Sequence, residues 1–243
     1  MDGPYLVELA RPASGGTLRY YGTRHVVDPL EPRATATLDA LRRGFAARRP
    51  SLVLIEGRLD WHFGGEAAAV QRFGEAGLTA SLARAAGLPL RSLEPEFADE
   101  VAAAVAEFGA RPVLAFYFLR VYASDRDRGE LGSDRETSAA GLLRKRAARL
   151  GLASSFADLA EFDRFWSESA AGQGDWRTLP AEALWRRADG TWLQRIAERI
   201  NAFRDEHMVA VLLEALARGE DVFAVCGASH VILQEPALRA ALR

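Results

Sequence analysis

Two histidines each lie three positions after a glycine, one near either end of the chain. Residues 22–25 (Gly-Thr-Arg-His) follow a β-prone run, and residues 227–230 (Gly-Ala-Ser-His) follow an apolar run. Glycine permits close approaches that a Cβ would forbid, so each motif can hold its histidine just beyond the carboxyl end of a strand. Ligands bind at that edge in open α/β sheets. His25 and His230 are therefore the first candidates for a functional site.

Carboxylates follow two further predicted strands. The apolar run 51–55 is followed by Glu56, and the run 88–93 is followed by Glu94. Imidazole plus carboxylate is a common ligand set for zinc, manganese or iron. A metal held in this way lowers the pKa of a bound water to about 7 and makes it a nucleophile. Each of these residues, taken alone, could instead be a hydrogen-bonded structural group. The prediction of a functional site therefore depends on their joint position at one edge of the sheet.

A predicted helix over residues 192–218 adds two more candidates. Arg204 and His207 are three positions apart and share a helix face. An enclosed arginine clamps carboxylates or stabilises developing negative charge, whereas an exposed one belongs to a solvated charge cluster. His207 would either complete a metal set or lie at the surface. His62 is expected at the rim of the site, in a loop near Glu56.

Strands and helices alternate in the elements that must position these residues. The predicted strands cover residues 4–10, 17–22, 51–57, 88–93 and 222–226, and the predicted helices cover residues 35–49, 67–86, 97–108, 192–218 and a short closing segment. This alternation is typical of βαβ units. We predict an α/β fold with a central, mostly parallel sheet flanked by helices. Residues 112–175 are predicted to form a helical insertion or cap within a single domain, 1–243.

Composition and charge narrow the class of protein. The chain has 243 residues, of which 49% are hydrophobic and 26% charged, as in ordinary globular proteins. Its net charge of −2 gives no reason to expect nucleic acid as a partner. The sequence shows no secretory signal and no run of about 18 apolar residues, so we expect a cytoplasmic protein without a membrane partner. The single cysteine, Cys226, is expected to be a buried thiol, and the oligomeric state stays open.

Four short segments together resemble a known family. Residues 22–26, 55–56, 204–208 and 225–231 occur in the order seen in TraB/PrgY-like proteins. These proteins belong with GumN and the Tiki metalloproteases in a wider superfamily that includes erythromycin esterases and ChaN. The resemblance extends from residue 17 to about residue 235 but is specific only at the four segments. It implies an α/β core in which both histidines, a strand-end glutamate and a helix arginine converge in one cleft.

The resemblance also implies roles for single residues. His25, Glu56 and His230 match catalytic or metal-binding positions, and Arg204 matches a contact to the substrate or transition state. Tiki-type members resemble divalent-metal-dependent peptidases, whereas esterase-type members use a histidine to activate water. Arg24 departs from the pattern, and its bulk is expected to reshape the substrate entrance.

These observations favour a hydrolase. Water, activated by a divalent metal (manganese, zinc or cobalt) on His25, Glu56 and His230 or by a histidine alone, would attack a peptide or ester carbonyl of a peptide or small molecule. Glu94, on its strand-end position, and His207 are further candidates for substrate binding. One alternative is a protein that binds haem, a metal or a peptide on the same scaffold without turnover. Another is a structural module in which the two motifs only cap the sheet.

Overall fold

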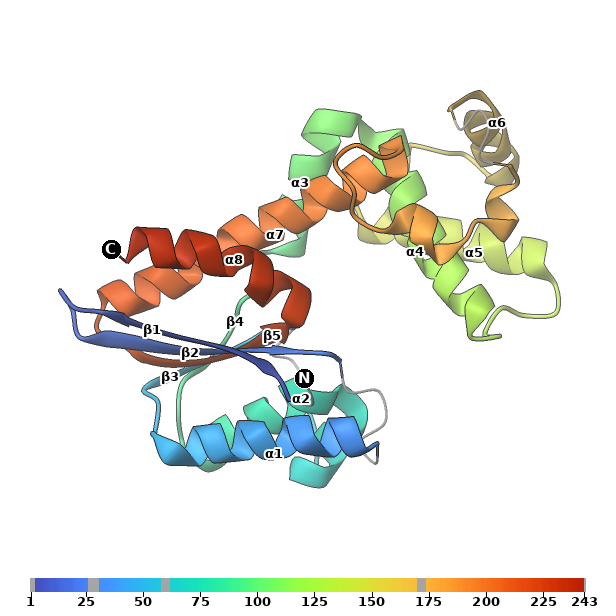
Figure 1. The fold of residues 1–243 in the computed structure, drawn as a ribbon. Helices are drawn as coiled ribbons and strands as arrows, with labels where there is room; N and C mark the ends of the chain where they lie inside the picture. Colours follow the sequence, from blue (N-terminus) through green and yellow to red (C-terminus); the bar gives the residue numbers. More distant parts are fainter. Residues whose placement is uncertain (1–2, 26–30, 58–61, 170–173, 243) are drawn as a thin grey trace. The chain divides into compact units, whose positions relative to one another are not determined.

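The computed structural model divides into two compact units. It describes residues 3–25, 31–57, 62–169 and 174–242. The first unit comprises Met1–Pro95 and Arg204–Arg243, and the second comprises Glu96–Phe203. The first unit contains the sheet, and the second is built of helices (Figure 1).

Among the described residues, five strands form one sheet in the order β1-β2-β5-β3-β4. Their bounds are β1 (Tyr5–Arg11), β2 (Gly16–Thr23), β3 (Leu52–Ile55), β4 (Leu90–Ser92) and β5 (Asp221–Gly227). β1 is antiparallel to β2, whereas β2, β5, β3 and β4 run parallel to one another. The predicted α/β fold with a mostly parallel sheet is therefore confirmed.

Helices cover both faces of this sheet (Figure 1). They are α1 (Pro32–Ala47), α2 (Glu66–Ala85), α7 (Trp192–Ala217) and α8 (Ala228–Ala241). Because successive side chains of a strand point to opposite faces, Leu52 and Leu54 of β3 pack with α7 and α8. Val53 and Ile55 pack with α1 and α2 on the other face. Burial on both faces explains why β3 reads as a continuous apolar run.

The second unit has its own aromatic core. It contains α3 (Phe97–Phe108), α4 (Ala110–Asp127), α5 (Arg135–Arg149), α6 (Leu159–Ser169), two short 3-10 helices (Trp176–Thr178 and Ala181–Leu184) and the first turns of α7. Phe118 packs edge-on against Phe162 and Trp176, with ring centroids 5.0 and 5.3 Å away. The predicted helical insertion, residues 112–175, lies within this unit.

The helix α2 bends at a glycine. The sequence pattern predicted one continuous helix over residues 67–86, but Gly74 has φ 58° and ψ −135°, outside the helical range. Glycine adopts this left-handed φ without a steric cost. Close packing follows at Gly77, where a Cβ would lie 2.1 Å from the carbonyl oxygen of Ala69. The bend places the buried Glu75 directly after it, facing the end of β2.

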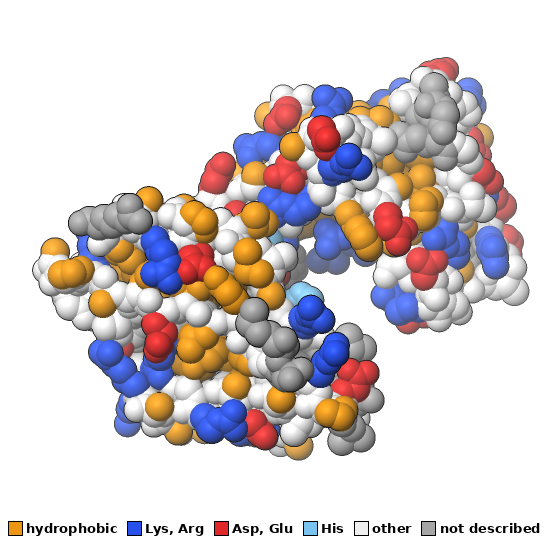
Figure 2. All heavy atoms as spheres, viewed as in Figure 1, with side chains coloured by type: hydrophobic (Ala, Val, Ile, Leu, Met, Phe, Trp, Pro, Cys, Tyr) orange, Lys and Arg blue, Asp and Glu red, His pale blue; other side chains and the backbone are white. Residues whose placement is uncertain are grey.

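The surface carries charges of both signs. On the face drawn in Figure 2, acidic and basic side chains are interspersed with exposed hydrophobic ones. The large exposed hydrophobic side chains include Leu6, Trp185, Ile232 and Leu233. No helix among the described residues combines the length and hydropathy needed to cross a bilayer.

Candidate functional site

The carboxyl ends of four neighbouring strands meet at one edge of the sheet. Thr23 of β2 is paired with Gly227 of β5, and Ile55 of β3 lies opposite both Val225 of β5 and Ser92 of β4. Each strand is followed within three residues by one of the predicted polar side chains: His25, His230, Glu56 and Glu94. The strand register thus brings together residues that are far apart in the chain.

Glu56 lies at the centre of this edge. Its Oε2 accepts hydrogen bonds from the backbone N–H of Gly227 at 2.6 Å and from Sγ of Cys226 at 3.0 Å. Its Oε1 accepts from Nη2 of Arg204 at 2.8 Å and lies 3.8 Å from Nε2 of His230. One carboxylate therefore connects β3, β5, α7 and α8.

These contacts keep Glu56 ionised. Burial alone would raise the pKa of its carboxyl, but the Cys226 thiol, the Arg204 guanidinium, the Gly227 N–H and His230 together lower that pKa from 4.5 to about 2. Burial and the Glu56 charge raise the pKa of Cys226 well above its usual value. Cys226 is therefore a neutral hydrogen-bond donor at neutral pH, and a thiolate nucleophile is not available there.

Arg204 is shared between two carboxylates. It binds Glu94 through both Nε and Nη2, with Nε 2.8 Å from Oε2, and its Nη2 also binds Glu56. Its side chain is only 15% exposed. Although burial lowers the pKa of a guanidinium, Glu94 and Glu56 raise the pKa of Arg204 overall. The three side chains together carry a net negative charge, so the positive charge of Arg204 is already offset within the protein.

His230 is buried and held by a carboxylate. Its Nδ1 lies 2.6 Å from Oδ1 of Asp205, and the same oxygen accepts from Nε2 of Gln234 at 2.7 Å. The Gln234 Oε1 accepts in turn from the Tyr20 hydroxyl at 2.8 Å. We assign the proton of the neutral imidazole to Nδ1 from these contacts, which leaves Nε2 facing Glu56.

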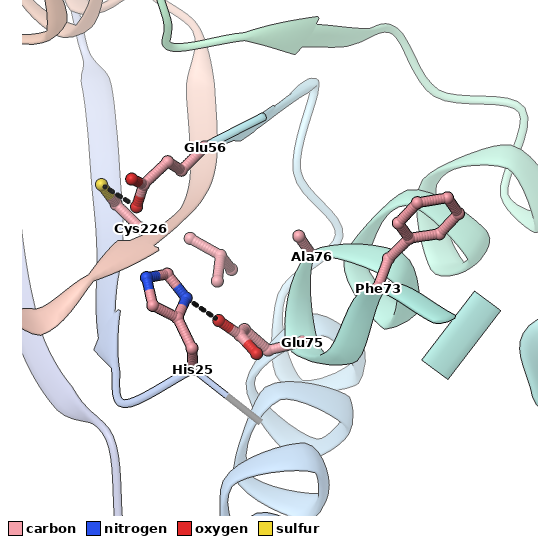
Figure 3. A pocket seen from close by; sticks show the side chains of 7 residues that line it. His25, Glu56, Phe73, Glu75, Ala76 and Cys226 are labelled. Carbon is pink, nitrogen blue, oxygen red and sulfur yellow. Dashed lines mark hydrogen bonds and ion pairs between the residues drawn. The ribbon is translucent and has the colours of Figure 1, made fainter. Parts of the chain in front are cut away.

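His25 forms a second imidazole–carboxylate pair (Figure 3). Its Nδ1 lies 2.9 Å from Oε1 of Glu75, an oxygen that also accepts from the Thr23 hydroxyl at 3.1 Å. Its Nε2 lies 3.5 Å from where a Cβ on Gly227 would stand, and Oε2 of Glu56 lies 3.2 Å from that same point. The absence of a side chain at Gly227 thus lets the imidazole and the carboxylate approach β5 together.

The two histidines differ in exposure. The His25 side chain is 70% exposed, and that of His230 is 7% exposed. The hydrogen bond to Glu75 raises the pKa of His25 above 6.5; burial lowers it, and the charges of Glu75 and Glu56 raise it further. Of the two imidazoles, His25 is therefore the one that solvent and small molecules reach.

A cavity of about 200 Å³ opens beside His25. Figure 3 shows the polar and apolar side chains that surround it, which come from α2, from β5 and from the residues that follow β2 and β3. The lining residues are His25, Glu56, Phe73, Glu75, Ala76, Val225 and Cys226. His230 and Arg204 are not among them, so the cavity combines one imidazole with two carboxylates.

The predicted metal ligands do not form a coordination set. Within the described parts of the chain, no three His, Cys, Asp or Glu side chains are arranged to hold a metal ion. Glu56 already accepts three hydrogen bonds through its two carboxylate oxygens. The Nδ1 atoms of His25 and His230 contact other carboxylates, so Nε2 is the ring nitrogen that remains available on each histidine. This arrangement gives no support to a divalent metal on His25, Glu56 and His230, which stays a prediction.

Three other candidates lie outside the network. Arg24 is exposed and forms no hydrogen bond or ion pair with another described residue. His207 is partly exposed on α7, and among the described residues it has no hydrogen bond to the site. His62 is exposed in the loop before α2. Sharing a helix face with Arg204 was thus not enough to bring His207 into contact with Glu56.

Sequence reasoning missed the carboxylates that orient the histidines. Asp205 directly follows Arg204, but it binds a histidine 25 positions away, and no local pattern links the two. Glu75 lies 50 positions from His25, inside a stretch that looked uniformly helical. The only local signal for Glu75 is the glycine before it, which marks the bend in α2.

The chain was also compared with known proteins. No protein-family model, no curated protein and no solved structure matches it at a significant level. The contacts of the site are therefore the basis on which a function is inferred.

Proposed function

We propose that the chain is a hydrolase in which His25 activates water for attack on an ester or peptide carbonyl. The observation that carries the proposal is the 2.9 Å contact between His25 Nδ1 and Glu75 at the cavity. A carboxylate on one ring nitrogen fixes the tautomer, so the other nitrogen is free to accept a proton. The motif resemblance to esterases that use a histidine in this way supports the same role.

The proposed reaction has two proton transfers. Water bound to Nε2 of His25 gives up a proton as its oxygen forms a bond to the carbonyl carbon, and the carbonyl electron pair moves to oxygen. When the tetrahedral intermediate collapses, the bond to the leaving group breaks. The imidazolium then returns the proton to the leaving oxygen or nitrogen, which yields an acid and an alcohol or amine.

Glu75 stabilises the imidazolium that forms between these steps. Its carboxylate is 6% exposed and accepts from both His25 and Thr23, so the charge–charge contact is only weakly screened on that side. The charge of Glu56 acts in the same direction on His25. A base whose pKa is raised toward neutrality is suited to proton transfer at physiological pH.

Hydrolysis of a panel of small esters and peptide amides tests the proposal. We expect turnover above the uncatalysed rate, unchanged by a chelator such as EDTA, because His25 acts without a metal. A panel without any hydrolysed member would overturn the proposal. Loss of activity in EDTA with recovery on adding zinc or manganese would instead favour metal-bound water.

The dependence of kcat/KM on pH should report the His25 pair. The base acts in its neutral form, so activity should rise with pH through a pKa above 6.5. Glu75→Gln removes the charge that raises this pKa and should shift the rise to lower pH while reducing the maximal rate. If kcat/KM of the variant rose over the same pH range as that of the unchanged protein, a group other than His25 would be titrating.

Binding of haem without turnover has no support in the geometry. The cavity of about 200 Å³ is below the roughly 300–1,000 Å³ of typical small-molecule pockets. The structure therefore offers no specific observation in favour of that alternative.

A further inference from the structure

We infer that the cavity selects substrates with a protonated amine next to the scissile carbonyl, such as amino acid esters and amides with a free α-amino group. This inference deepens the proposed hydrolase function and rests on it. It follows from the charge, the size and the hydrogen bonding of the cavity, none of which was apparent from the sequence.

Among the residues that the structure describes, the charges that line the cavity are negative. Glu56 and Glu75 both contribute carboxylates to its wall, and the base His25 is neutral in its active form. Arg204, which lowers the pKa of His25 through its charge, already binds Glu56 and Glu94. Clefts lined by one sign of charge raise the local concentration of ions of the opposite sign. An ammonium group is therefore attracted, whereas a substrate carboxylate or phosphate would lie against Glu56.

The volume limits what the substrate can be. The volume of about 200 Å³ lies below the roughly 300–1,000 Å³ of typical small-molecule pockets. Phe73, Ala76 and Val225 form the apolar part of the wall. A single small acyl group fits such a space, with a short apolar side chain against this wall and its ammonium toward the carboxylates.

The hydrogen-bond donors of the site point to the same class of substrate. The Gly227 N–H and Nη2 of Arg204 are both used by Glu56, so neither is aimed at an incoming carbonyl oxygen. A substrate ammonium next to the carbonyl would itself place positive charge beside the oxyanion that develops during attack. The ammonium of the substrate thereby stabilises the oxyanion, a role that the Gly227 N–H and Arg204 cannot take while they are bound to Glu56.

A matched pair of esters tests the inference. Hydrolysis of alanine methyl ester and N-acetylalanine methyl ester is followed by acid release, each rate being divided by its own uncatalysed rate. We expect kcat/KM to favour the free amine on the order of tenfold or more, given the strength of charge pairs near a protein surface. The preference should shrink as salt is added. Equal or reversed rates would overturn the selectivity alone, whereas hydrolysis of neither ester would overturn the proposed function as well.

Two variants of one residue separate charge from bulk. Ala76 lines the cavity on α2. Ala76→Lys and Ala76→Met add side chains of similar length, but only the first adds positive charge. We expect Ala76→Lys to reduce the preference for the free amine several-fold more than Ala76→Met does. The same preference in both variants would contradict an electrostatic origin.

Discussion

Replacing His25 with glutamine is expected to lower kcat/KM by about 10²–10⁴-fold, the usual contribution of a general base. Glutamine can still hydrogen-bond to Glu75, but it cannot take a proton from water. Because the His25 side chain is 70% exposed, the variant should keep nearly all of its folding stability. Initial rates on the best ester, together with thermal unfolding of both proteins, measure the two effects separately.

Two other histidine variants serve as controls for this result. His62 is exposed before α2 and outside the network, so His62→Gln should leave kcat/KM unchanged. His230 does not line the cavity, so His230→Gln should reduce activity less than His25→Gln does. If His230→Gln abolished activity while His25→Gln kept it, the base would be His230, oriented by Asp205.

Replacing Arg204 with methionine is expected to lower the free energy of unfolding by about 3–5 kcal/mol, because it leaves two largely buried carboxylates without their partner. Glu56 and Glu94 are 16% and 21% exposed, so water screens them only in part. Chemical denaturation measures the loss. Arg218→Met, in the turn directly after the same helix, is the matched control, since the pair of Arg218 with Glu214 is exposed and such pairs contribute about 1 kcal/mol or less. Equal losses in the two variants would contradict a special role for the Arg204 ion pairs.

The same contacts should make the fold sensitive to acid. The pKa of Glu56 is lowered from 4.5 to about 2, so its contribution is present above about pH 4.5 and is lost as pH falls through about 2. That difference corresponds to about 3 kcal/mol of stability at neutral pH. The Arg204→Met protein, which lacks the main counter-charge, should lose less of its remaining stability over this range.

Much of the site's location could be predicted from the sequence, because strand ends are marked locally. The apolar run before Glu56 and the glycine after the run that ends at Cys226 both identify the edge at which ligands bind. The insertion of β5 between β2 and β3 could not be predicted, because it pairs residues such as Tyr20 and Ala224 that lie far apart in the chain. The residue types therefore predicted which edge of the sheet holds the site, but not which strands lie next to one another there.

The chemistry of the site was harder to predict than its place. Histidine and glutamate are typical metal ligands, but which atoms remain available depends on packing between helices and strands. Arg204 occupies Glu56 Oε1 because α7 passes over the end of β3, and Glu75 reaches His25 because α2 bends at Gly74. Neither contact leaves a periodic signal in the sequence, so the atoms that remain available to a ligand could not be predicted.

The ion pair between Glu94 and Arg204 has a consequence for how this protein could diversify. The chain passes from the first unit to the second after Pro95 and returns at Arg204, so these two residues flank the two crossing points. The segment between Pro95 and Arg204 leaves and re-enters the first unit beside one ion pair. Such a segment can be lengthened, shortened or exchanged by recombination without changing the order of the strands in the sheet. Descendants of this chain could therefore inherit the sheet-edge chemistry intact while acquiring entirely different helical inserts.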